Sequence, residues 1–233
     1  MAYPRYAIYF TPPPSSPLAQ FGASVIGYDC FERADVAHPH TKSLNGKTFA
    51  RITTDPRKYG FHATLVAPFH LERVTEADLL SALSEFTRDN LPIDIGPLAV
   101  DTIGAFIALK PETKIPKVDK LAAALVEFFD PYRASLSEAD RVRRMTAHLS
   151  PRQRELLGRW GYPFVLDQFR FHMTLTNALQ AAELSAVKSA LAELYNGLAR
   201  NHVELDALSL MRQDRPDERF HLLARKGLKG KAK

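Results

Sequence analysis

This chain of 233 residues contains one cysteine, Cys30, and therefore cannot form an internal disulfide bond. Such sparing use of cysteine is typical of a reducing compartment, which predicts a cytoplasmic protein. No apolar run approaches the roughly 20 residues that a membrane-spanning helix needs. The first residues, MAYPRYAIYF, lack the pattern of a secretory signal. We therefore expect no association with a membrane.

Two common nucleotide-binding patterns are also missing. The sequence has neither a glycine-rich dinucleotide fingerprint nor a P-loop, which argues against the enzyme classes that depend on them. Hydrophobic residues make up 45% of the chain and charged residues 24%, enough for an ordinary soluble core. At this length we expect one large domain or two closely packed lobes.

The net charge is +5, and part of it comes from the C-terminal stretch ARKGLKGKAK, residues 224–233. These ten residues include five Lys or Arg and no acidic residue. One interpretation is a basic arm for nucleic acid. The other is a solvated terminus without a site, which is the commoner fate of a short exposed tail and the one we favour. An anionic substrate is compatible with either.

The most informative feature is a duplicated motif. YGFHATLVAPF (59–69) and FRFHMTLTNAL (169–179) share an aromatic residue, His, any residue, Thr and Leu, and the second His follows the first by 110 positions (172 − 62). Each motif precedes a helical pattern and two strand patterns. When the histidines are aligned, IDIGPLAV, which begins at Ile93, lies under VELDALSL, which begins at Val203, because each starts 31 residues after its histidine (93 − 62 and 203 − 172). The unit strand–helix–strand–strand is therefore used twice.

The remaining segments fit around this duplication. A strand is expected at 5–10, a loop at 11–17, a short helix within 18–31 and mostly loop over 32–58. The helix of the first copy should cover 75–90, with Thr75 and Asp78 at its N-terminus, and that of the second copy 183–198. Strands are expected at 92–101, 104–111, 203–212 and 219–226. A helix at 118–133 and a helical insertion at 136–160 separate the copies, the insertion serving either as a lid or as a packed connector.

These patterns predict an α+β fold. We expect a single bilobal domain over 1–233 with pseudo-twofold symmetry, in which two antiparallel sheets face a central groove and the helices lie outside. The first repeat spans about 59–111, the helical connector and insertion about 117–162, the second repeat about 165–226, and a basic tail 227–233.

In a strand, alternate residues share a face. His62 and Thr64 should therefore point together, as should His172 and Thr174, while their apolar neighbours anchor the strands in the core. Two imidazoles and two hydroxyls converging on one space suit phosphodiester chemistry. One His removes a proton from water or a hydroxyl and the other protonates the leaving oxygen, while the hydroxyls donate to phosphate oxygens. We expect neither a metal nor another cofactor, because His-x-Thr is not a usual zinc spacing.

Counting back from each histidine in steps of two reaches Lys58, four residues before His62, and Arg170, two residues before His172. Both cations therefore have the right parity to approach an anion. For Arg170, substrate binding and simple exposure to water are equally consistent with the sequence; for Lys58, which lies further from its histidine, exposure to water is favoured. The other six histidines show no comparable pattern. His38 and His40 lack the Cys or carboxylate partners of a metal site, and His221 has no counterpart in the first copy.

FHATL and FHMTL resemble the paired His-x-Thr motifs of the 2H phosphoesterase superfamily, which includes RNA 2′,3′-cyclic phosphodiesterases. The resemblance implies the bilobal fold, metal-independent hydrolysis, catalysis by His62 and His172, and phosphate binding by Thr64 and Thr174. RYAIYFTPPPSSPL, with the two motifs, is further similar to a bacterial subfamily associated with phosphonate metabolism. That similarity implies a small cyclic phosphate sugar, such as a ribosyl cyclic phosphate, as substrate.

Three functional hypotheses therefore remain. The first is a cyclic phosphodiesterase acting on a small sugar phosphate or nucleotide metabolite. The second is an RNA-end 2′,3′-cyclic phosphodiesterase, which the basic tail slightly favours. The third is a catalytically silent nucleic-acid-binding module, and two intact proton-transfer groups argue against it. The oligomeric state and the acid and base roles of the two histidines are left open.

Overall fold

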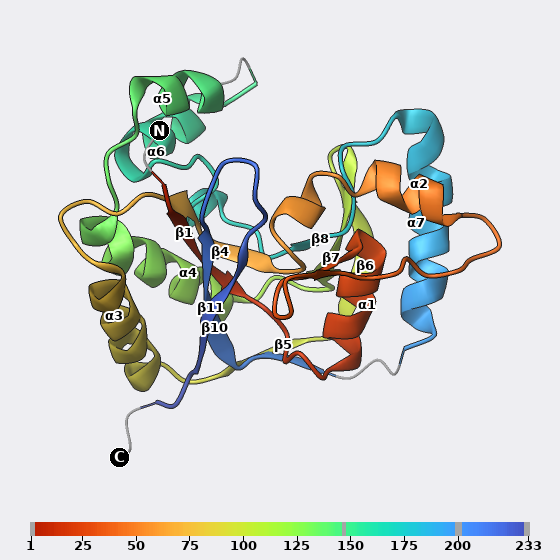
Figure 1. The fold of residues 1–233 in the computed structure, drawn as a ribbon, viewed down its shortest axis with the longest axis horizontal. Helices are drawn as coiled ribbons and strands as arrows, with labels where there is room; N and C mark the ends of the chain where they lie inside the picture. The colour runs from red at the N-terminus through yellow and green to blue at the C-terminus, as the bar shows by residue number, and fades with distance from the viewer. Residues whose placement is uncertain (1–2, 146–147, 199–201, 231–233) are drawn as a thin grey trace.

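The computed structural model describes residues 3–145, 148–198 and 202–230, and is an α+β fold (Figure 1). Its main sheet has seven strands in the order β11-β10-β1-β4-β8-β7-β6, and every neighbouring pair is antiparallel. The strands are β1 (Arg5–Phe10), β4 (Ala63–Phe69), β6 (Leu98–Ile103), β7 (Phe106–Pro111), β8 (Met173–Thr174), β10 (Ala207–Gln213) and β11 (His221–Gly227). Two-stranded sheets pair β2 (Tyr28–Asp29) with β3 (Ala34–Asp35), and β5 (Ile93–Gly96) with β9 (Val203–Leu205).

The sequence predicted two separate sheets, and here the prediction is wrong. The two halves form one sheet, because Ala63 of β4 pairs with Met173 of β8 at its centre. The copies also exchange strands. The hairpin β6–β7 of the first copy lies beside β8 of the second, whereas β10–β11 of the second reaches β4 of the first through β1. Each histidine motif is thus flanked by strands from outside its own copy.

The pairing register reveals the symmetry of the duplication. Ala63 pairs with Met173, and Asp94 of β5 pairs with Glu204 of β9. In both cases the partners are 110 residues apart (173 − 63 and 204 − 94), the same offset that separates the two histidines. Equivalent residues of the two copies therefore pair with each other at two places, as a local twofold axis through the molecule requires.

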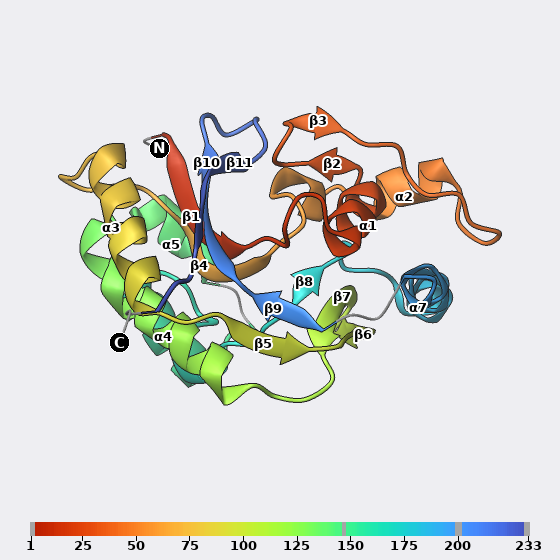
Figure 2. The same ribbon diagram turned by 90° about the horizontal axis from the view of Figure 1, so that it is seen from below.

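The helices cover the two ends of the sheet (Figure 2). α3 (Glu76–Asp89) packs against β10 and β11, α4 (Pro116–Phe129) against β4, and α7 (Ala181–Asn196) against β6 and β7. The remaining helices are α1 (Pro17–Ile26), α2 (Gly46–Ile52), α5 (Glu138–Arg144) and α6 (Pro151–Trp160), with short 3₁₀ helices η1 (Pro56–Lys58), η2 (Asp130–Tyr132) and η3 (Leu166–Gln168). None of the described helices is long and apolar enough to cross a membrane.

Local sequence explains several boundaries. α3 begins at a capping box in which Thr75 accepts from the Asp78 backbone and Asp78 accepts from that of Thr75. α6 starts after Ser150, which caps it, and ends at Gly161, whose φ of 73° is in the left-handed region. These helices and those at 118–133 and 183–198 were predicted to within a few residues. The tail at 227–233 lies partly outside the described residues.

The prediction of mostly loop over 32–58 holds for 15 of its 27 residues, because β3, α2 and η1 together take up only 12. The sequence analysis did not anticipate α2, which forms because the Asn45 side chain accepts from the Thr48 N–H and because Phe49 and Ile52 are buried. The long strands predicted at 92–101 and 203–212 are each divided, at Gly96–Pro97 and at Asp206. In both copies the first piece joins the small sheet and the second joins the main one.

Candidate active site

The two histidine motifs meet on neighbouring central strands. Because Ala63 pairs with Met173 in an antiparallel register, continuing that register by one residue sets His62 opposite Thr174 and Thr64 opposite His172. His62 and His172 are then diagonal neighbours across the two strands, as are Thr64 and Thr174. Residues in this relation lie about 7–8 Å apart. The register thus places both imidazoles and both hydroxyls next to one another on two neighbouring strands.

Burial along both motifs alternates as the strand pattern predicted. The apolar residues Phe61, Ala63, Leu65, Phe171, Met173 and Leu175 are all buried. The four polar residues between them are partly exposed. The apolar side chains fix the strands from behind, so the polar side chains share the opposite face.

Each imidazole is held in the same way. His62 Nδ1 donates to the carbonyl of Gly60, and His172 Nδ1 to the carbonyl of Arg170, both at 2.8 Å. A carbonyl only accepts, so Nδ1 carries the proton in the neutral ring and Nε2 offers its lone pair to the site. Gly60 has a φ of 78°, in the left-handed region that favours glycine. This turn directs its carbonyl back toward His62.

The surroundings of the two rings differ. Tyr9 of β1 stacks on His62 with ring centroids 3.7 Å apart and planes 17° apart. His62 Nε2 also lies 3.1 Å from the hydroxyl of Thr64. His172 has a tilted neighbour, Phe106, at 5.6 Å, and no described residue bonds its Nε2. The His172 Nε2 is therefore open toward a ligand, whereas that of His62 shares a hydrogen bond.

Burial lowers the pKa of both histidines. Loss of solvent lowers the pKa of His62 from 6.5 to about 4, the hydrogen bond from Nδ1 partly opposes this, and a positive His172 lowers it further. Burial also lowers the pKa of His172, and the nearby Arg170 acts in the same sense. Both shifts favour the neutral ring over the charged one in the free protein. Since the charge of His172 influences the pKa of His62, the two rings are close enough to act as a pair.

The two predicted cations lie in different situations. The Arg170 side chain is exposed, and no residue in the described ranges forms a hydrogen bond or ion pair with it. Lys58 lies in η1 rather than in a strand, so the parity argument does not apply to it. Its ammonium group is 2.9 Å from Asp55. The structure therefore leaves Arg170 available beside His172 and gives Lys58 another partner.

Sequence reasoning missed Tyr9, because its role depends on the pairing of β1 with β4. Tyr9 lies opposite Thr64 in that register. No pattern in RYAIYF indicated which strand β1 would adjoin. Within β1, Arg5, Ala7 and Tyr9 share a face, and on this face Tyr9 contacts His62.

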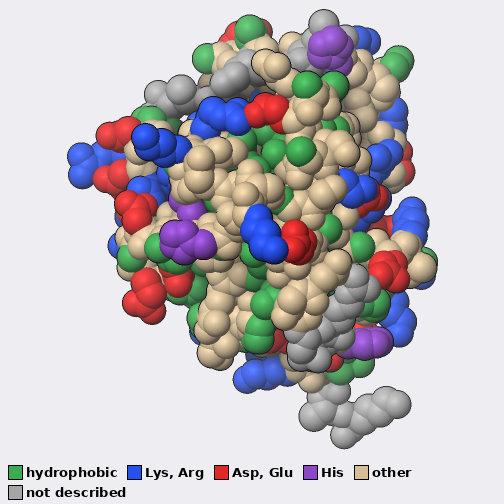
Figure 3. Space-filling model, turned by 90° about the vertical axis from the view of Figure 1, so that its right-hand side faces the viewer, with side chains coloured by type: hydrophobic (Ala, Val, Ile, Leu, Met, Phe, Trp, Pro, Cys, Tyr) green, Lys and Arg blue, Asp and Glu red, His purple; other side chains and the backbone are tan. Residues whose placement is uncertain are grey.

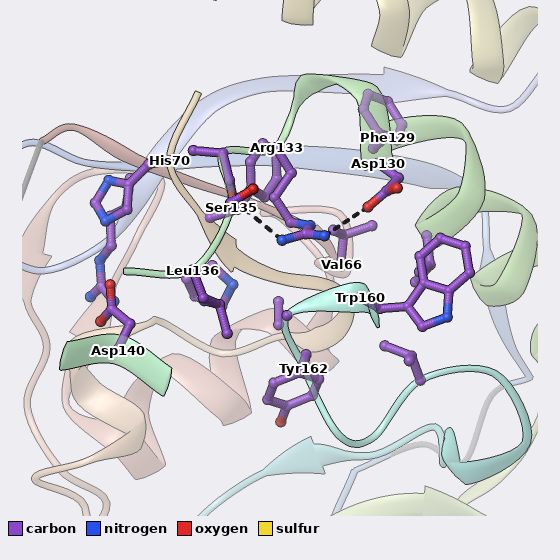
Figure 4. A pocket seen from close by; sticks show the side chains of 18 of the residues that line it. Val66, His70, Phe129, Asp130, Arg133, Ser135, Leu136, Asp140, Trp160 and Tyr162 are labelled. Atoms are coloured by element: carbon purple, nitrogen blue, oxygen red, sulfur yellow. Dashed lines mark hydrogen bonds and ion pairs between the residues drawn. The ribbon is translucent and has the colours of Figure 1, made fainter. Parts of the chain in front are cut away.

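A hollow of about 620 Å³, open to solvent, lies further along β4 (Figure 4). Val66 and Pro68 of β4 line it on one side and Arg5 of β1 on another. The predicted insertion contributes Arg144 and Tyr162, which directly follows α6 and Gly161. The hollow thus adjoins the histidine motif on the side of the insertion.

No cluster of three or more His, Cys, Asp or Glu side chains suited to a metal occurs within residues 3–145, 148–198 and 202–230. His38, one of the two histidines considered for such a site, stacks on Phe49 and bonds to Ser24 and Arg57 instead. It is part of the packing around α2.

Fold and site together define a duplicated α+β protein with a paired histidine–threonine centre. The chain belongs to the family described as "Protein of unknown function (DUF1045)", whose model matches residues 64–221. That range includes Thr64, His172 and Thr174.

Two curated relatives share the name ribose 1,5-bisphosphate phosphokinase PhnN. The one from Janthinobacterium sp. (strain Marseille) is 36% identical over 93% of this chain and 49% of its own length. The one from Laribacter hongkongensis (strain HLHK9) is 33% identical over 86% of this chain and 46% of its own. The chain therefore spans about half the length of the curated relatives it matches.

Among solved structures, E. coli LigT complexed with 3′-AMP matches 97% of this chain and 98% of its own, at 14% identity and a TM-score of 0.42. TT0787 of Thermus thermophilus matches 98% of this chain and all of its own, at 14% identity and a TM-score of 0.44.

Proposed function

We propose that this protein is a metal-independent phosphodiesterase that opens a cyclic phosphate on a small sugar phosphate or nucleotide metabolite. The observation that carries the proposal is the antiparallel meeting of two His-x-Thr motifs, with each imidazole held through Nδ1 so that Nε2 is presented to the site. The resemblance of both motifs to those of 2H phosphoesterases supports the same chemistry.

The reaction consumes one water. Nε2 of one histidine takes a proton from water as the water oxygen attacks phosphorus. The ring P–O bond breaks, and the other histidine gives its Nε2 proton to the leaving oxygen. The product is a phosphomonoester beside a free hydroxyl. One proton has moved from the second histidine to the first by way of the substrate, and exchange with solvent restores the starting state.

The two threonines and Arg170 bind the phosphate. Thr64 and Thr174 lie in the two motifs with hydroxyls able to donate to its non-bridging oxygens, and Arg170 brings a positive charge beside His172. Lys58, bonded to Asp55, contributes at most a distant positive charge. The neutral histidines do not offset the substrate's negative charge, so Arg170 supplies the attraction. A bound anion in turn favours protonation of the histidine that acts as acid.

A sugar phosphate is the preferred substrate class. The curated relatives are named for a kinase of ribose 1,5-bisphosphate, and this chain has no P-loop pattern in its sequence. We assign the kinase activity to the half of those relatives that this chain does not match, and to this chain the release of a sugar phosphate from a cyclic precursor. The similarity to a phosphonate-associated subfamily favours a ribosyl cyclic phosphate.

RNA ends remain the alternative substrate. The face formed around α2 and α7 carries acidic and basic side chains interspersed (Figure 3), among them the pairs Arg51–Glu183 and Lys188–Asp101. A strand-binding surface is expected to be a stripe of one sign. That face therefore offers no support for RNA, and an oligonucleotide ending in a 2′,3′-cyclic phosphate belongs in the substrate panel as the competing case.

The test is hydrolysis of a panel of cyclic phosphates in excess EDTA. We expect wild-type turnover of a sugar or nucleotide cyclic phosphate under these conditions. His62→Ala and His172→Ala should each lower the rate by at least about 10²-fold, because each removes a proton-transfer group, and Thr174→Val by less. His148→Ala, at an exposed histidine away from the site, is the matched control. Activity that requires an added divalent ion, or a fully active histidine variant, contradicts the proposal.

A further inference from the structure

Three tyrosine hydroxyls near the ring of Tyr9 have no hydrogen-bond partner among the described residues. They belong to Tyr9, Tyr59 and Tyr162. Among the described residues the buried side-chain atom without a partner is Arg212 Nε, so all three hydroxyls reach the solvent even though Tyr9 is only 1% exposed. Each hydroxyl is therefore a donor that a ligand can use in place of water.

A cation lies in the same neighbourhood. Arg5 donates to the side-chain oxygen of Gln213, a neutral group, through Nε at 2.8 Å and also through Nη2. Its guanidinium lies over the ring of Phe220, 5.4 Å from the centroid. No carboxylate within the described ranges pairs with it. The positive charge of Arg5 is therefore not neutralised.

These groups gather around one buried ring. Phe220 contacts Arg5, stacks with Tyr59 at 5.4 Å, and lies 6.3 Å from the ring of Tyr9. Tyr162 is near enough that it and Tyr59 both act on the titration of Tyr9, and Arg5 does so with the opposite sign. In Figure 4 the hydroxyl of Tyr162 points away from Arg133 and Trp160.

The three tyrosines and Arg5 offer hydrogen-bond donors to a ligand. Burial raises the pKa of Tyr9 and of Tyr162, so both phenols keep their protons throughout the physiological range. The guanidinium of Arg5 only donates. A ligand that satisfies three donating hydroxyls and one cation is rich in acceptor oxygens and carries negative charge. The nearby Asp130 does not oppose this, since Arg133 and Arg159 both pair with it.

We propose that Tyr9, Tyr59, Tyr162 and Arg5 form a second anion subsite, which binds a phosphoryl group of the substrate remote from the cyclic phosphate at the histidines. The position fits such a role. Tyr9 touches His62, and Arg5 lies four residues away on the same face of β1, roughly 13 Å between Cα atoms. Arg5 and Tyr162 line the same hollow, and an anion bound there is about one sugar from the reacting phosphorus. This inference rests on the proposed function and identifies its substrate as doubly phosphorylated.

Paired substrates test the subsite. Adenosine 2′,3′-cyclic phosphate is compared with its 5′-phosphorylated form, which differs only in the remote phosphate. We expect wild type to prefer the phosphorylated form by at least tenfold in kcat/KM. Tyr162→Phe and Arg5→Gln should each reduce that ratio severalfold. Tyr6→Phe is the matched control, because Tyr6 is also on β1 but bonds Glu76 on the opposite face, and it should keep the wild-type ratio.

A binding measurement separates this proposal from the first. Calorimetry of ribose 5-phosphate against ribose needs no hydrolysis. We expect binding that depends on the phosphate and weakens in Tyr162→Phe and Arg5→Gln. Wild type that opens both cyclic phosphates equally well, or variants that leave the ratio unchanged, overturn the subsite while the phosphodiesterase stands. If no cyclic phosphate of the whole panel is opened, the proposed function fails, and equal binding of ribose and ribose 5-phosphate then overturns the subsite as well.

Discussion

At the scale of single residues, His62 and His172 have the same hydrogen bond from Nδ1 but different neighbours. Tyr9 covers one face of His62, whereas His172 has Phe106 at an angle and Arg170 beside it. The immediate surroundings of the two imidazoles therefore do not obey the twofold relation of the motifs. An asymmetric pair is what acid–base catalysis needs, because one ring must hold a proton while the other does not.

The lowered pKa values set the pH dependence. A two-histidine mechanism is active when one proton is shared by the pair, since with two protons there is no base and with none there is no acid. The pKa of His62 is about 4 and that of His172 is below 6.5. We therefore expect kcat/KM to be highest on the acid side of pH 6.5 and to fall about tenfold per pH unit well above the pKa of His172. Rates measured from pH 4.5 to 9 on a phosphodiester substrate, which does not titrate in this range, check this. An optimum above pH 7 contradicts it.

At the scale of the element, the turn before β4 fixes His62. Gly60 supplies the carbonyl that holds the imidazole, and a Cβ at this glycine would lie 2.6 Å from Cys30 Cβ and 2.8 Å from its sulfur. The turn thus depends on a residue without a side chain for two reasons, its positive φ and its contact with Cys30.

Gly60→Ala tests the turn. The substitution costs about 1–2 kcal/mol for the left-handed backbone and more for displacing Cys30, and moving the carbonyl releases the His62 ring. We expect a lower Tm together with a loss of kcat greater than tenfold. Gly96→Ala is the matched control, because Gly96 also has a positive φ of 67° but nothing within 4 Å of its Cβ position. It should lose stability while keeping activity, and a Gly60→Ala variant that behaves the same way would show that the carbonyl is not needed.

The same scale explains what the sequence could predict. His62, Thr64, His172 and Thr174 were recognisable because the duplication repeats them at a fixed offset with the same apolar neighbours. The helices were predictable because capping residues such as Thr75 and Ser150 mark their starts. Tyr9 and Tyr162 were not, because each comes from a segment with no repeat partner, and Tyr59 was not, because its repeat partner Phe169 has no hydroxyl. Their proximity depends on which strands adjoin, and single-sequence periodicity does not encode that.

At the scale of the whole molecule, the exchange of hairpins makes the two copies interdependent. β6–β7 completes the half that contains β8, and β10–β11 completes the half that contains β4 through β1. Neither copy carries all the strands that surround its own histidine. This is why periodicity alone suggested two sheets, whereas the two copies share one main sheet.

The interdependence predicts one cooperative unfolding transition. Trp160, the only tryptophan, lies in α6 of the insertion, so its fluorescence reports on the insertion, while circular dichroism at 222 nm reports on all the helices. Arg144, which precedes α6 in the insertion, donates a hydrogen bond to the Pro68 carbonyl of β4 and so ties the insertion to the sheet. We therefore expect the two urea curves to coincide. A chain ending after Pro111, which lacks β8, β10 and β11, should not fold. An earlier Trp160 transition would mean that the insertion unfolds separately from the sheet, and a folded truncated chain would mean that the copies are independent after all.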